Sequence, residues 1–505
     1  MSIAMAQSSN RSPHIIRLSQ AFHLPRCANS LDHILAVTAA MSEKSSSGHL
    51  HSLITSAAPT FAGADLHQLP SAKPQTKFFA TTPDAETLLL SLAPCATTLL
   101  RCERSLIPSE VALLRWLSGV SDDTCPSPTT DDHAPLHAGL MSASRDGARR
   151  VVPQPSPQLL RPFLPSLLKH GRACNGRHGE YILTKPVAGT TIASLNPPLT
   201  DKERACVDFQ VGELLRCISS HQSPNGKFGT AVAVLSLEST ASDALWQRAA
   251  MSDLNCCHDH WSDAFLCILE SALRDAEDFR VAIRYEAVRD HVGRFRHLLD
   301  AVTRPCLVAV DAGEDATTLV SSQTESRLRD DRRLQSDPEE IRKQKIRFSQ
   351  VTEGDISRDT NGSWRSKARP VRATMRVTGI QEWSNCVFGD PLFASVLSRN
   401  ASPEIWDGFT SPLEGQDADE TLDVTANVRV RRLLYECHHA VTAIVREYCR
   451  RRSDSDDREL PARKRLTQVL RSLDRLDDFG RERRTPPCAE SSPAKKPRSL
   501  DGGHV

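Results

Sequence analysis

The segment Leu307–Val320, LVAVDAGEDATTLV, places three acidic residues between two apolar runs. Short apolar runs separated by polar residues and glycine are typical of strands joined by a turn, so we expect a strand, a turn and a second strand. Asp311, Glu314 and Asp315 would then share one turn. Carboxylates in this arrangement can serve as a general base and as ligands for a hard cation. Acids in turns are also common as solvated or capping residues, and this second interpretation stays open.

A second cluster, Asn255–Trp261 (NCCHDHW), holds two cysteines and two histidines within five positions. Zinc sites usually separate their ligands and draw them from two segments. We therefore interpret the cluster as a loop in which Asn255 or Asp259 caps the helix that follows, with metal binding as the alternative. The 15 cysteines are otherwise scattered and form no CxxC pair, which indicates reduced thiols in an intracellular protein.

The composition limits the classes of function. The chain has 505 residues, of which 25% are charged, and a net charge of +1. This balance gives no reason to expect bulk attraction to nucleic acid or to an anionic membrane, and no apolar run has the roughly eighteen residues of a membrane helix. We expect a soluble protein of the cytoplasm or nucleus whose partner is a small molecule or a protein. The N-terminal RSPHIIRLSQAFHLPR is faintly similar to a mitochondrial transit peptide, with disorder or a start at Met41 as alternatives.

Apolar periodicity from residue 76 onward predicts strands and helices that could position these acids. We expect a hairpin in KFFATTPDAETLLLSLAP (77–94) and a strand in GEYILTKPVAGTTIASL (179–195). Thr200 followed by Glu203 forms a capping box at the start of a helix. Helices are expected at seven segments: 105–119, 163–171, 200–221, 261–279, 285–302, 430–451 and 462–476.

Eight segments in this order resemble fungal members of the aminoglycoside-phosphotransferase-like family, which has the bilobal protein-kinase-like fold. They are TLLLSLAP, LLRCERSLIPSEVALLRWL, YILTKPVAGTTIASL, LTDKERACVDFQVGELLRCI, ESALRDAEDF, LLDAVTRPCLVAVD, VTGIQEWSNCVFGDPLF and RRLLYECHHAVTAIV. The resemblance covers about residues 76–475 without the loop and the insert named below. It implies an α+β protein with a small β-containing N-lobe and a mainly helical C-lobe.

The expected organisation combines this resemblance with composition. The N-lobe is placed at 76–190, and the C-lobe in two parts at 191–320 and 373–480. Four polar or irregular segments cannot bury enough apolar surface to offset the entropy of ordering, so we expect disorder in them. They are the N-terminal segment 1–75, a loop at 121–158, a charged insert at 321–372 and the tail 481–505. For the insert, non-native sequence from a gene-model error is the alternative.

The resemblance also implies roles for single residues. In the family, a lysine on an N-lobe strand pairs with a helix glutamate, and these positions correspond here to Ser91 and Glu110. The glutamate also fits the first turn of its helix, where a carboxylate complements the helix dipole. Lys185 falls near the adenine-contacting hinge, where the backbone makes the contacts.

The family's catalytic loop reads His-x-Asp with an Asn five residues after the Asp. The corresponding residues are Ala309, Asp311 and Ala316, so only the catalytic base is retained. The later metal-binding Asp corresponds to Glu382. Asp311 equally fits a structural role, as a buried acid that accepts backbone N–H bonds at a strand end.

Two functions follow from this comparison. The resemblance implies a phosphotransferase that uses ATP and Mg²⁺ on a small hydroxyl-bearing substrate, with Asp311 as base and Glu382, Glu314 and Asp315 as metal ligands. The changed Lys, His and Asn positions favour a pseudokinase-like binding or scaffold protein instead. A nuclear regulatory role, suggested by the basic cluster AKKPR, is a third and weaker alternative.

Overall fold

The computed structural model describes residues 48–69, 73–94, 99–119, 159–172, 179–236, 257–322, 375–399, 401–412 and 427–483. The expected loop at 121–158, almost all of the insert at 321–372 and most of the tail lie outside these residues. The chain divides into two compact units, residues 1–62 and 63–505. The described part of the first unit is helical at 48–55 and has a 3₁₀ turn at Pro59–Phe61.

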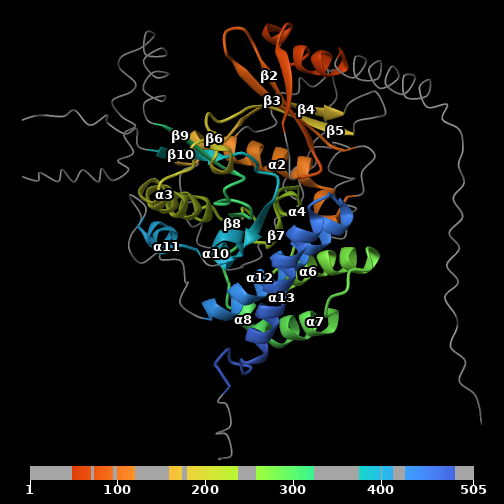
Figure 1. The fold of residues 1–505 in the computed structure, drawn as a ribbon, viewed down its shortest axis with the longest axis vertical. Coiled ribbons are helices and arrows are strands. Elements are labelled where there is room, and N and C mark those ends of the chain that lie inside the picture. The colour runs from red at the N-terminus through yellow and green to blue at the C-terminus, as the bar shows by residue number, and fades with distance from the viewer. Residues whose placement is uncertain are drawn as a thin grey trace, which may run out of the picture. The chain divides into compact units, whose positions relative to one another are not determined.

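A five-stranded antiparallel sheet opens the second unit, with the strand order β1-β2-β3-β5-β4 (Figure 1). Its strands are β1 (Asp65–Leu69), β2 (Thr76–Thr81), β3 (Thr87–Leu92), β4 (Ser166–Arg172) and β5 (Glu180–Lys185). The expected hairpin is confirmed: β2 and β3 pair from Thr76↔Leu92 to Thr81↔Thr87. β1 lies within the segment expected to be disordered, and pairing with β2 extends the sheet beyond its expected start.

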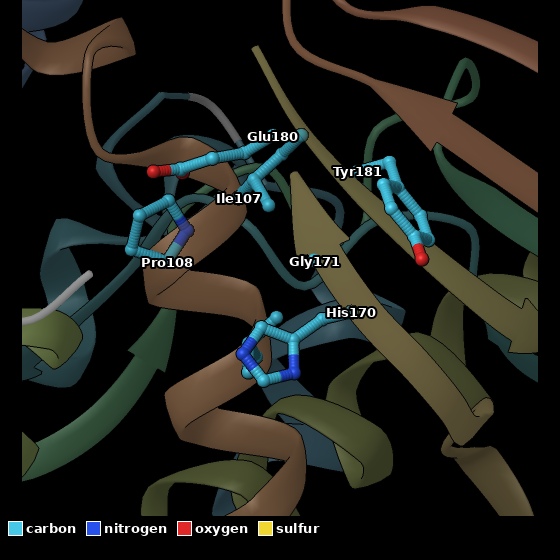
Figure 2. A pocket seen from close by; sticks show the side chains of 7 residues that line it. Ile107, Pro108, His170, Gly171, Glu180 and Tyr181 are labelled. Carbon is cyan, nitrogen blue, oxygen red and sulfur yellow. The ribbon is translucent and has the colours of Figure 1, made fainter. Parts of the chain in front are cut away.

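Helix α2 (Leu106–Ser118) packs against β4 and β5 of this sheet. Its expected end is confirmed, since Gly119 closes it in the left-handed conformation that glycine adopts without strain. Figure 2 shows a recess between α2 and these strands, lined by Ile107, His170 and Tyr181 among others. The recess has a volume of about 10 Å³, enough for about one water molecule, so it holds no substrate.

The strand-turn-strand pattern at 307–320 is confirmed, and its two strands belong to different sheets. β8 (Cys306–Ala309) is the edge of a sheet with the order β7-β11-β8, whereas β9 (Thr318–Ser322) is the centre of a sheet with the order β10-β9-β6. The turn between them therefore connects two sheets. The remaining strands are β6 (Thr190–Thr191), β7 (Gly229–Thr230), β10 (Met375–Ile380) and β11 (Cys386–Gly389).

Helices form most of the remaining described residues. The longer ones are α3 (Asp201–Ser219), α6 (Trp261–Asp278), α7 (Tyr285–Arg294), α11 (Pro403–Thr410), α12 (Val428–Cys449) and α13 (Ser455–Asp474). Shorter ones are α4 (Ala231–Ser236), α8 (Arg296–Leu299) and α10 (Ser395–Ser398), with 3₁₀ turns at Arg101–Glu103, Arg161–Phe163, Ile192–Ser194 and Pro391–Phe393. α12 packs along α13 and crosses α6 (Figure 1). No described helix is long and apolar enough to cross a bilayer.

Asp390 links the helical part to β11 through buried hydrogen bonds. One carboxylate oxygen accepts the backbone N–H of Leu392 at 3.0 Å. The other accepts the Tyr435 hydroxyl and the Arg431 guanidinium, each at 2.6 Å. The Tyr435 hydroxyl in turn accepts the Trp261 indole N–H at 2.7 Å. This network ties α12 and α6 to the end of β11 through hydrogen bonds that meet at one buried carboxylate.

The sequence-based expectations are mostly confirmed at the level of elements. The α+β class is confirmed, with a sheet-rich first part and a mainly helical second part, and so is the Thr200–Glu203 capping box. The helix expected at 163–171 is wrong, because most of that segment pairs with β5 as strand β4. The helix expected at 285–302 is divided into α7 and α8. Asp259 does not cap α6: His260 is the N-cap, without a side-chain bond, and Asn255 lies outside the described residues.

Candidate functional site

Two of the acids expected at the site lie beside one ammonium group. Asp311 follows β8, and Glu382 follows β10 on the neighbouring sheet. The Lys73 Nζ lies 3.0 Å from Asp311 Oδ2 and 2.8 Å from Glu382 Oε2. It also donates to the Ser384 hydroxyl at 3.2 Å. The chain therefore brings three segments together around one cation, from before β2, after β8 and after β10.

A second lysine completes this cluster from the sheet. Lys77, on β2, is 2% exposed, and its ammonium lies 2.5 Å from Glu382 Oε1. The sequence comparison placed the lysine position at Ser91 on β3 and overlooked both lysines. Lys77 pairs with Ser91 in the strand register, and cross-strand partners project from the same face of a sheet. The structure therefore places a lysine beside the expected position, on the adjacent strand. The available sequence signal was a lone lysine inside the apolar run TKFFAT.

The opposite charges of this cluster stabilise one another's ionised forms. Burial alone would raise the pKa of Asp311, but Lys73, Arg446 and the Asn385 amide outweigh it and lower the pKa to about 2. Burial likewise opposes ionisation of Glu382, and the two lysines lower its pKa to about 2. The two carboxylates hold the pKa of Lys73 above its usual value despite burial. At neutral pH the site is an ionised cluster of two carboxylates and two ammonium groups.

The Asp311 carboxylate is oriented by a neutral group as well. The Asn385 side-chain amide donates to Asp311 Oδ2 at 3.0 Å, from the turn between β10 and β11. This turn also carries Glu382 and Ser384. One short segment thus supplies the second carboxylate, a hydroxyl and an amide to the site.

Glu110 reaches the same region from α2. It is buried, and its Oε1 accepts the backbone N–H of Trp383 at 3.3 Å. Burial raises its pKa, against the lowering effect of the Lys77 charge. No ion pair joins Glu110 to a described lysine, so its contact with the site runs through the backbone next to Glu382.

Two further acids expected at the site make other contacts. Glu314 Oε1 accepts the Ser395 hydroxyl at 2.6 Å and lies 3.5 Å from the Arg399 guanidinium. The Asp315 carboxylate accepts two hydrogen bonds, each 2.9 Å, from Arg204 on α3. Both acids follow Asp311 in the same turn, but their partners lie on other elements.

Lys185 is the last residue of β5 and is exposed, opposite Ser166 on β4. Ala309 is buried in β8, and Ala316 is exposed in the turn after Asp311. Neither alanine has a side chain that could bind an ion or a phosphate. The structure thus brings Asp311 and Glu382 together, with Glu110 bonded to the backbone next to Glu382. Lys185 is not among the residues that line the neighbouring cavity.

A cavity of about 150 Å³ opens beside Asp311. Lys73, Asp311, Ser384 and Asn385 line one side of it. Other lining residues come from the segment around α2, from α6 and from α12, among them Glu103, Ser109, Ser271, His438, His439 and Arg446. Closed cavities of about 150 Å³ are known to hold a six-membered ring, and this cavity is partly open, so a ligand can extend beyond it. The site therefore combines a charged cluster with room for a small molecule.

The donor set does not fit a divalent metal ion in this arrangement. Asp311 and Glu382 direct their oxygens at the Lys73 ammonium, which occupies the position between them. In the described part of the chain, no group of three His, Cys, Asp or Glu residues could hold a metal. The two lysines and the two carboxylates pair with one another, and Lys73 holds the cation position.

Comparison with solved structures gives remote likenesses, among them two small-molecule kinases. No known family and no curated protein matches the sequence. A protein described as a fructosamine-3-kinase from Thermobifida fusca has 12% identity and a TM-score of 0.40, covering 82% of this chain and 94% of that one. The GDP complex of aminoglycoside 2'-phosphotransferase-IIIa has 12% identity and a TM-score of 0.38, covering 84% of this chain and 98% of that one. Likeness this remote carries no argument about activity.

Proposed function

We propose that this chain is a kinase-like phosphotransferase that moves a phosphoryl group from ATP to a hydroxyl of a small molecule. One observation carries the proposal: Asp311 and Lys73 line a small-molecule cavity, and Glu382 pairs with both Lys73 and the buried Lys77 beside them. Phosphoryl transfer needs a carboxylate near the attacking hydroxyl and positive charge near the phosphate oxygens, and this cluster supplies both.

Each residue has a distinct role in this proposal. Asp311 lines the cavity, so its ionised carboxylate accepts the hydrogen bond of the attacking hydroxyl and takes the proton as the new O–P bond forms. Lys73 and Lys77 offset the charge on the phosphate oxygens. Glu382 holds both ammonium groups at 2.8 and 2.5 Å, and Asn385 fixes the orientation of Asp311. ATP supplies the phosphoryl group and leaves as ADP when the bridging O–P bond breaks.

Mg²⁺ stays a prediction for this chain. The two carboxylates face Lys73, so a metal ion could contact both only after this lysine moves away. The roles given above therefore run through the lysines alone. Glu314 and Asp315, also predicted as metal ligands, would have to leave Ser395 and Arg204.

The alternative is a binding protein that retains the cavity without catalysis. Two observations favour it: the Lys73 ammonium fills the space between the carboxylates, and the side chains at 309 and 316 carry no polar group. In this alternative, the charged cluster holds the sheet to the helical part, and the cavity binds a ligand that is not altered.

Transfer of radioactive γ-phosphate from ATP distinguishes these two functions. The full-length chain is incubated with a panel of sugars, polyols and hydroxy acids, with and without Mg²⁺. The phosphotransferase proposal predicts a labelled product that Asp311→Asn reduces about 10²- to 10⁴-fold, because the general base is lost. An exposed control, Arg471→Gln, should keep full activity. Binding of ATP without any transfer of its γ-phosphate would contradict the phosphotransferase proposal and favour the binding protein.

A further inference from the structure

The acids that line the cavity beside Asp311 are all paired. Glu103 receives two bonds of 2.6 Å from the Arg450 guanidinium. Glu314 contacts Ser395 and Arg399, and Asp311 contacts Lys73 and Asn385. No lining carboxylate is therefore left to attract a cationic ligand.

Arg446 is a positively charged residue of the same cavity lining. It projects from α12, lines the cavity and is partly exposed. Among the residues that the structure describes, its guanidinium has no hydrogen-bond or ion-pair partner, and its Nε is buried without an acceptor. A guanidinium is built to bind a carboxylate or phosphate through parallel N–H donors. The missing acceptor thus points to a ligand that brings one.

Neighbouring lining residues are neutral and offer unused hydrogen-bonding groups. His438 and His439 are both buried, and burial lowers the pKa of each, that of His439 to about 4. Both are uncharged at neutral pH. Ser109 Oγ and His438 Nδ1, in residues 3% and 8% exposed, have no partner. Among the described residues, Arg446 is thus a charged group without a hydrogen-bonded partner, in a lining that is otherwise neutral or paired.

We infer that Arg446 binds an acidic group of the ligand in this cavity, so that the acceptor is a small hydroxylated carboxylate or phosphate ester. The guanidinium would hold the acid at one end while a hydroxyl faces Asp311 at the other. Arg446 is near enough for its charge to act on the Asp311 carboxylate. That the ligand accepts a phosphoryl group rests on the proposed function, whereas its preference for an anion is a statement about binding alone.

Calorimetric titration with four six-carbon compounds of different charge tests this preference. Gluconate, glucose and glucosamine are anionic, neutral and cationic versions of one six-carbon skeleton, and glucose 6-phosphate distinguishes a phosphate from a carboxylate. The wild-type chain should bind gluconate or glucose 6-phosphate at least about tenfold more tightly than glucose, since a charge-assisted hydrogen bond contributes that much. Glucosamine should bind no better than glucose.

Variants at Arg446 separate a binding role from a structural one. Arg446→Gln should bring the affinities for gluconate and glucose together, and Arg446→Lys should restore part of the difference. Arg471→Gln, an exposed arginine on α13, should leave the difference unchanged. The inference fails if Arg446→Gln keeps the anion preference, if glucosamine binds best, or if none of the four sugars binds at millimolar concentration.

These outcomes are independent of phosphoryl transfer. An anion preference that depends on Arg446, in a chain that transfers no phosphate, would support the inference and remove the proposed function. Phosphoryl transfer to a neutral or cationic acceptor, at a rate that Arg446→Gln leaves unchanged, would support the proposed function and contradict the inference.

Discussion

Lys77 lies directly opposite Ser91 across the β2–β3 pair, and both side chains are almost completely buried. Residues paired in this way lie on one face of a sheet, so a lysine on either strand could reach the same acid. Lys77 does so, with its ammonium 2.5 Å from Glu382. The site has no lysine at the expected position, Ser91, but the adjacent strand supplies one at Lys77.

Glu382→Gln should destabilise the protein by about 3–5 kcal/mol, because it leaves two buried ammonium groups without their shared carboxylate. Urea unfolding followed by circular dichroism measures this change. The double variant Glu382→Gln/Lys77→Met should lose less than the two single variants together, since one uncompensated charge is removed with its partner. A loss below about 1 kcal/mol for Glu382→Gln is the size expected for a solvent-exposed ion pair, and it would contradict a buried one.

Lys73→Met should create a divalent-cation site. The substitution removes the ammonium between Asp311 and Glu382 and leaves two carboxylates directed at one point. Electron paramagnetic resonance of Mn²⁺ measures the bound fraction. We expect weak or no Mn²⁺ binding by the wild-type chain and binding by Lys73→Met at least about tenfold tighter, as expected for added hard oxygen ligands. Lys77→Met retains Lys73 and serves as the control. Tight Mn²⁺ binding by the wild type would show that Lys73 does not hold the cation position.

Stability should fall as the pH is lowered from about 6.5 to about 4. Burial lowers the pKa of His439 from 6.5 to about 4 and that of His438 well below 6.5, so in this window the unfolded chain binds protons that the folded chain does not. Each histidine contributes at most about 3 kcal/mol to this loss. His438→Phe should flatten the dependence of the free energy of unfolding on pH, whereas His297→Gln, at an exposed position, should not. An unchanged slope in His438→Phe would show that His438 is protonated in the folded protein.

Gly212→Ala should destabilise the contact between α3 and α11 by about 1–3 kcal/mol. A Cβ at this position would lie 2.2 Å from the Ile405 carbonyl oxygen, so the two helix backbones would have to separate. Gly293→Ala is the matched helical control, with nothing within 4 Å of its added Cβ, and should stabilise by about 0.5–1 kcal/mol. Thermal unfolding compares the two. Equal effects of both substitutions would contradict the close approach of α3 and α11.

Local sequence patterns were sufficient where the structure depends on neighbouring residues. The acids of the 307–320 segment, the capping box at Thr200 and the closing Gly119 follow from spacing and residue type. The segment 163–171 shows the limit: its leucines have near-helical spacing, yet pairing with β5 holds it extended, because tertiary context overrides local propensity.

The charged cluster could be found only in part from sequence. Asp311 and Glu382 were identified singly, but their common partner Lys73 is more than 200 positions away, before β2. Which strand supplies a lysine depends on strand pairing that no local pattern records. Glu314 and Asp315 share a turn with Asp311, and their partners on α3 and α10 became visible only in the folded chain.

Calorimetric titration with ATP tests the central claim most directly. The claim is that the Lys73 and Lys77 ammonium groups offset the negative charge of the ATP phosphates. Binding to the full-length chain should weaken at least about tenfold in Lys77→Met and in Lys73→Met, because each substitution removes a charged donor. Arg471→Gln should bind as the wild type does. Equal affinity in all four proteins, or no binding at millimolar ATP, would contradict the account.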